Sequence, residues 1–145
     1  ASDVYKRQII ERNRVELFIA FATDDGDTFN DDHFGMARFF HIYKFSRGGE
    51  EFIETRKNAR YQEDETIRHG DPEKAQAVSS VLKDIDVIVG RKMGPNIFRL
   101  LKKYVCVVNK TAFIHDAIVQ VHENMKKIME EKEKGEDRKH IVLRP

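Results

Sequence analysis

A histidine two residues before a glycine is the pair in this chain best suited to metal chemistry. His33 is followed directly by Phe34 and Gly35. The imidazole of a histidine can ligate iron and other transition metals. A glycine near it lets the backbone come close to a ligand. The tripeptide therefore predicts one wall of a site for a metal-containing ligand.

A basic segment with two glycines, residues 90–96, is the second candidate wall. It is predicted to connect a buried strand to a helix, where the N–H groups and dipole of the first turn favour an anion. Arg38, close to the first segment, would add positive charge. The predicted contacts in the second segment are Arg91, Lys92, Met93, Gly94 and Asn96.

The remaining metal-binding side chains are few. His69 precedes a predicted helix and is a second candidate metal ligand. Cys106 is the single cysteine of the chain, whereas a thiolate-held [4Fe–4S] centre takes four. It lies in a predicted buried strand, which is typical of a small hydrophobic side chain. A lone cysteine also forms no internal disulfide, which fits a reducing cytoplasm.

The first half of the chain predicts three strands. The apolar run at residues 15–22 indicates a central strand buried on both faces. Residues 39–45 and 51–56 flank a glycine turn and predict an antiparallel hairpin. The charges of residues 51–56 suit an edge strand.

The second half predicts helices that alternate with parallel strands. Asp71 and Pro72 are a typical helix start, residues 87–89 and 105–108 are short buried strands, and a helix opens at Gly94-Pro95 between them. A long amphipathic helix follows from residue 111 to about 133. The order β-β-β-α-β-α-β-α predicts a ribonuclease H-like, three-layer α/β fold with a mixed five-stranded sheet covered by helices.

We expect one domain, over residues 9–133. Residues 1–8 resemble the in-frame translation of a transposon-end adapter from sequencing libraries, and we exclude them from fold reasoning. Residues 134–145 are rich in charge and predict a disordered tail.

The composition argues against several classes of protein. Lys and Arg number 26 against 25 Asp and Glu, so the chain lacks the basic excess of a nucleic-acid-binding domain. No apolar run approaches the ~20 residues of a membrane span, and no secretory apolar region is present. We therefore expect a cytoplasmic protein that binds neither nucleic acid nor membrane.

The spacing of the candidate segments resembles a known family. An apolar strand, the pattern His-Phe-Gly-x-Ala-x-x-Phe at residues 33–40 and the pattern Gly-x-x-Met-Gly-Pro-Asn at residues 90–96 are similar to the dinitrogenase iron–molybdenum cofactor-binding family. The resemblance covers residues 15–129. It implies a cofactor-biosynthesis accessory protein in nitrogen fixation, without enzymatic activity.

The resemblance also implies a ligand and partners. The ligand would be iron–molybdenum cofactor, its precursor or a related metal–sulfur cluster, bound transiently with His33 as the expected contact. With one cysteine, the chain is suited to carry a preassembled cluster rather than to build one. Cofactor-assembly or nitrogenase-like proteins are the implied partners.

Two alternatives stay open. A cofactor-free regulatory or scaffold domain of the same fold would bind a protein partner. A divalent-metal hydrolase would use Asp24, Asp25 and Asp27, although these residues do not match the calcium-loop template. With Asp31 and Asp32 they form an acidic loop that would repel an anionic cluster unless its carboxylates point away or are neutralised.

Overall fold

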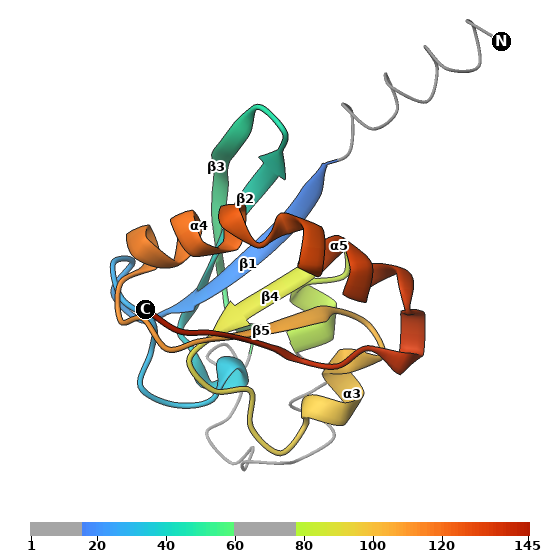
Figure 1. Cartoon of the computed structure of the whole chain (residues 1–145). Helices are drawn as coiled ribbons and strands as arrows, with labels where there is room; N and C mark the ends of the chain where they lie inside the picture. The colour runs from blue at the N-terminus through green and yellow to red at the C-terminus, as the bar shows by residue number, and fades with distance from the viewer. Residues whose placement is uncertain (1–15, 60–77) are drawn as a thin grey trace, which may run out of the picture.

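A six-stranded mixed sheet forms the centre of the part of the chain that the computed structural model describes, residues 16–59 and 78–145 (Figure 1). The strands are β1 Leu17–Thr23, β2 Phe39–Ser46, β3 Gly49–Lys57, β4 Val87–Gly90, β5 Val105–Asn109 and β6 Ile141–Leu143. They lie in the order β3-β2-β1-β4-β5-β6. β1, β2 and β3 pair antiparallel, whereas β1, β4, β5 and β6 run parallel. The predicted α/β class is confirmed, with six strands instead of five.

The sheet separates two apolar layers because alternate side chains of a strand point to opposite faces. On β1, Ile19 and Phe21 enter one layer and Ala20 enters the other, so this strand is buried on both faces as predicted. Helices α4 (Ile114–Glu123) and α5 (Met125–Glu133) cover the first layer. The second layer is covered by the 3-10 helix η1 (Phe34–Met36), residues 78–85 and helix α3 (Ile97–Leu101).

The disordered tail predicted at residues 134–145 is wrong. After the 3-10 helix η3 (Gly135–Asp137), β6 pairs with β5, and Ile141 lies opposite Val107. Ile141 and Leu143 are buried while Val142 is exposed. An alternation of only three residues does not stand out among charged neighbours, and its pairing partner is remote in the sequence.

The long helix predicted over residues 111–133 is two helices, α4 and α5. Asn124 separates them with φ −110° and ψ 17°, outside the helical range. Its side-chain amide donates to the carbonyl of Gln120 at 2.7 Å. Asparagine competes with helical hydrogen bonds in this way. The helix start predicted at Asp71-Pro72 lies outside the described residues, and residues 78–81 are helical.

Strand β3 forms the exposed edge of the sheet beside β2. Ile42 pairs with Glu54 and Tyr43 with Phe52, so Ile53 has no partner position on β2. Such a one-residue insertion is a β-bulge, which bends and twists an edge strand. The predicted hairpin of β2 and β3 is therefore present, with an irregularity that the sequence pattern did not reveal.

Candidate functional site

The two predicted walls leave the sheet at the same edge. β1 ends at Thr23 and β4 at Gly90, and the two strands are parallel neighbours with Phe21 opposite Val89. Ligand sites of open α/β sheets lie beyond the carboxyl ends of such strands. Residues 24–38, here the acidic segment, follow β1, and residues 91–96 of the basic segment follow β4. Both stand where a ligand of this fold class is expected.

The acidic and basic segments are in contact through a backbone hydrogen bond and through Gly94. The N–H of Phe34 donates to the carbonyl of Lys92 at 2.8 Å. Gly94 has φ +82°, and a Cβ placed on it would lie 2.7 Å from Cγ and Nδ1 of His33. A side chain at position 94 would thus be strained by its backbone angle and would collide with the imidazole. The contact requires glycine, and it joins the two predicted walls.

His33 has a fixed backbone and a partly exposed ring. Its carbonyl accepts hydrogen bonds from the N–H of Met36 at 2.8 Å and from the side-chain amide of Asn30 at 3.0 Å. The side chain is 35% exposed, with Nδ1 3.8 Å from a carboxylate oxygen of Asp32. Because its backbone is fixed and its ring is partly exposed, His33 is placed so that a ring nitrogen could bind a metal that approaches from solvent.

Two predicted contacts serve the core instead of facing a ligand. Phe34 is fully buried and stacks on Phe40 at a ring distance of 5.0 Å. Met93 is 4% exposed and lies in the same second layer. These side chains anchor the two segments to the sheet, so their contribution to the site is to position its backbone.

Asn58, at the end of β3, is a supporting residue that the sequence analysis missed. It is fully buried, and its side-chain amide donates to the carbonyls of Gly35 at 3.0 Å and Ala37 at 2.7 Å. Its own N–H donates to the carbonyl of Arg38 at 2.9 Å. An asparagine in a polar stretch carries no signal of such a role, because the role depends on which loop packs beside it.

The positive charge of the site lies on three side chains. Arg38 and Lys92 are exposed and Arg91 is half-buried. The guanidinium of Arg91 lies 3.7 Å from the carboxylate of Asp31, which offsets part of that charge.

Helix α3 contributes less than predicted to this positive charge. It begins at Ile97, after the half-buried Asn96, and has only five residues. The helix dipole expected at Gly94-Pro95 is correspondingly weak. Attraction of an anion therefore depends on the arginine and lysine side chains.

The carboxylates of the acidic segment are largely engaged by its own backbone. Asp25 accepts hydrogen bonds from the N–H groups of Asp27 and Thr28, both at 2.9 Å, and these bonds lower its pKa to about 2. Asp24 accepts from the N–H of Arg38 at 2.9 Å. Asp24 and Asp25 thus help to shape the loop, whereas Asp31 pairs with Arg91.

The described residues contain no group of three or more His, Cys, Asp and Glu side chains placed to hold a metal ion. The carboxylate of Asp25, central to the hydrolase alternative, is occupied by the loop's own N–H groups. This part of the structure therefore gives the hydrolase alternative no support.

Cys106 is fully buried in β5, and burial raises the pKa of its thiol to about 12. It stays protonated at neutral pH, whereas the thiolate is the metal-binding form. His69 lies outside the described residues. Within them, His33 is the predicted metal ligand that the structure places at the edge of the sheet where the two segments meet.

Comparisons with known proteins identify the family and the fold. A family model described as "Dinitrogenase iron-molybdenum cofactor" matches residues 15–131. A crystal structure from Methanocaldococcus jannaschii, described as a candidate dinitrogenase, is similar with a TM-score of 0.51 and 14% identity, over 76% of this chain and 91% of that one. That likeness shows a shared fold. The search of curated proteins finds no match. Among the described residues, no helix has the length and apolar character needed to cross a membrane.

Proposed function

This chain belongs to the dinitrogenase iron–molybdenum cofactor family, and we propose that it is a non-catalytic cytoplasmic carrier of a metal–sulfur cluster. The cargo would be iron–molybdenum cofactor, its precursor or a related cluster. The carrier would hold it at the edge where the acidic and basic segments meet.

The contact between His33 and Gly94 is the observation that supports this proposal best. It places an imidazole, partly open to solvent, against the loop that carries Arg91 and Lys92. Imidazole nitrogen is a suitable ligand for iron. Arg91 and Lys92 lie on the loop beside His33, because both segments leave the sheet at one edge. Their positive charge would attract an anionic cluster. One protein ligand with charged neighbours suits loose, reversible binding.

The buried thiol of Cys106 supports a carrier role over a building role. Assembly of an iron–sulfur centre on a protein takes several thiolates, and this cysteine is protonated and inaccessible. We propose that the cluster arrives complete and leaves complete.

Transfer of such a cargo requires a partner protein at the same edge. Phe98 lies on α3 two residues after Asn96, and its side chain is 78% exposed. A large exposed aromatic ring is a typical anchor in protein interfaces. We propose that a cofactor-assembly or nitrogenase-like protein docks beside it.

Anaerobic titration of the full chain with isolated iron–molybdenum cofactor tests the function. We expect a coloured complex with one cluster per chain, measured by visible absorption and metal analysis. His33→Ala should weaken binding by about tenfold or more, the loss of one ligand bond. His140→Ala, on an exposed residue just before β6, is the matched control and should bind like the wild type.

Two outcomes would contradict the proposal at different levels. Equal binding by His33→Ala and the wild type would remove the assigned ligand while leaving the carrier role in place. Absence of binding by the wild type would instead favour a scaffold domain of the same fold that binds only a protein partner.

A further inference from the structure

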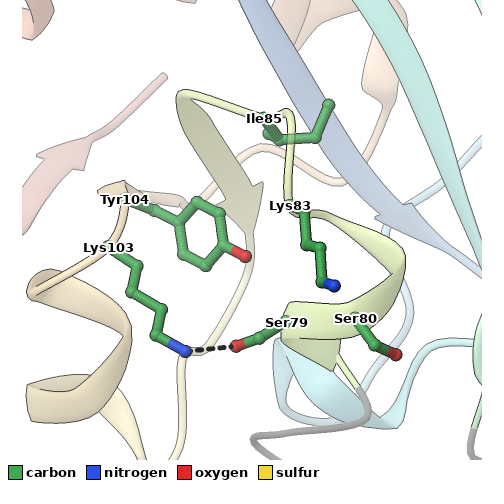
Figure 2. A pocket seen from close by; sticks show the side chains of 6 residues that line it. All are labelled: Ser79, Ser80, Lys83, Ile85, Lys103 and Tyr104. Atoms are coloured by element: carbon green, nitrogen blue, oxygen red, sulfur yellow. Dashed lines mark hydrogen bonds between the residues drawn. The ribbon is translucent and has the colours of Figure 1, made fainter.

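A pocket of about 480 Å³ lies on the second layer, and none of its described lining residues belongs to the site assigned above (Figure 2). Its volume falls within the ~300–1,000 Å³ of small-molecule sites. Two parts of the chain line it, the helical turn and loop at residues 78–85 and the connection from α3 to β5. The lining residues are Ser79, Ser80, Lys83, Ile85, Lys103 and Tyr104.

The described residues that line this pocket are positively charged. They include two lysines and no carboxylate. Asp84 lies next to Lys83 in the chain, but both of its oxygens accept hydrogen bonds from the guanidinium of Arg56, at 2.6 and 2.8 Å. Among the described residues, neither Lys83 nor Lys103 forms an ion pair with a carboxylate. A concave surface with this charge attracts an anion.

The hydrogen-bonding groups of the pocket suit an anion with several oxygens. The ammonium group of Lys103 donates to the hydroxyl of Ser79 at 3.2 Å, so these two groups from different parts of the chain already meet (Figure 2). Lys83 adds a second ammonium group to the lining. Lysine and serine are both donors to phosphate oxygens.

The rest of the pocket is apolar. The hydroxyl of Tyr104 donates to the carbonyl of Leu82 at 3.0 Å, which fixes the ring in place. Ile85 is 5% exposed and adds an aliphatic surface. A ligand that used the whole pocket would need an anionic group and a carbon body.

We propose that this pocket binds a small organic phosphate. Its phosphate group would contact Lys83, Lys103 and the hydroxyl of Ser79, and its carbon part would pack against Tyr104 and Ile85. The site shares no residue with the edge at which the cluster is proposed to bind. Its existence therefore does not depend on the proposed carrier function.

Titration of the full chain with phenyl phosphate, inorganic phosphate and phenol tests this proposal by calorimetry. We expect phenyl phosphate to bind more tightly than inorganic phosphate and phenol not to bind. Lys83→Gln and Lys103→Gln should each weaken phenyl phosphate binding by about tenfold, the effect of one charge-assisted contact. Lys102→Gln is the matched control, because Lys102 is exposed and adjacent in sequence but does not line the pocket.

Three results would overturn the proposal. The first is absence of phenyl phosphate binding by the wild type at millimolar concentration. The second is equal binding by the wild type and the Lys83→Gln, Lys103→Gln double variant, with circular dichroism showing that both are folded. The third is an equal loss in Lys102→Gln, which would indicate attraction to general surface charge.

Discussion

The acidic and basic segments that meet at the carboxyl edge of the sheet are built in opposite ways. In the acidic segment, the carboxylates of Asp24 and Asp25 accept hydrogen bonds from backbone N–H groups. In the basic segment, Lys92 is exposed and Gly94 makes room for a neighbour. The hydrogen bonds leave Asp25 ionised, because they hold its pKa at about 2. The two segments therefore differ in what their charged groups do: those two carboxylates order their own loop, whereas the ammonium group of Lys92 stays at the surface.

The two segments also differ in how they are attached to the sheet. Asn58 ties the acidic segment to the end of β3 through two side-chain hydrogen bonds. The basic segment is attached by the buried Met93 and by the carbonyl of Lys92, which accepts from Phe34. The acidic segment is therefore fixed to the sheet by Asn58, whereas the basic segment is positioned largely by its contact with the acidic segment.

The largest expected effect comes from removing the side-chain amide of Asn58, here called the brace. Asn58→Ala would leave the carbonyls of Gly35 and Ala37 without this donor, and we expect a loss of about 3 kcal/mol in the free energy of unfolding. Asn124→Ala, which removes one partly buried bond to Gln120, is the control and should cost about 1 kcal/mol. Urea unfolding of both variants measures the difference. Similar losses would show that the brace adds nothing beyond one ordinary bond.

A smaller effect is expected where the two segments touch. Gly94→Ala introduces a Cβ against His33 at a positive φ, and we expect a loss of about 2 kcal/mol in stability. Gly135→Ala has the same kind of backbone angle, φ +62°, with no neighbour near the added Cβ, and should cost about 1 kcal/mol.

The Gly94→Ala change should also displace the imidazole of His33 and weaken cluster binding, whereas Gly135→Ala should not. Wild-type affinity in Gly94→Ala, measured by the anaerobic titration, would contradict a role for this contact in the site.

The next effect concerns pH. The pKa of Asp25 is lowered from 3.8 to about 2 in the folded chain, so its carboxylate stabilises the fold fully above pH 3.8 and loses this effect as the pH falls through 2. We expect the wild type to have a higher Tm than Asp25→Asn at pH 5, and the gap to shrink towards pH 2. Asp27→Asn, at an exposed neighbour, is the matched control for the change of charge. A constant gap for Asp25→Asn would mean that its hydrogen bonds do not depend on charge.

The smallest effect is expected from the ion pair that links the two segments. Asp31→Asn frees Arg91 from its carboxylate and should strengthen cluster binding by about twofold, whereas Arg91→Gln should weaken it by a similar factor. Both effects should fade at high salt because the groups are exposed. Titration at two ionic strengths measures this. Changes of the same sign in both variants would refute an electrostatic role for the pair.

Much of the fold could be predicted because it depends on patterns within single segments. The apolar run of β1, the hairpin and the short parallel strands all follow from local periodicity. The meeting of His33 with Gly94 then follows from topology, since parallel neighbours end at one edge.

What could not be predicted depends on partners that are distant in the sequence. β6 is recognisable only beside β5, and the brace at Asn58 appears only when the acidic segment packs against β3. Phe98 is exposed while Leu100 and Leu101 fill the core, and all three are apolar, so residue type did not distinguish them. The orientation of the aspartates was equally hidden, because composition does not show which backbone N–H groups a carboxylate will reach.

The unpaired Ile53 has a consequence for how the protein behaves at high concentration. β3 is a nine-residue strand on the open side of the sheet, and both Phe52 and Ile53 are exposed there, at 49% and 39%. A straight strand of this kind is a template for fibril growth, since its outer backbone can recruit further chains. The bulge interrupts the regular spacing that stacking requires. We therefore expect this single irregular residue to lower the tendency of the edge to recruit further chains.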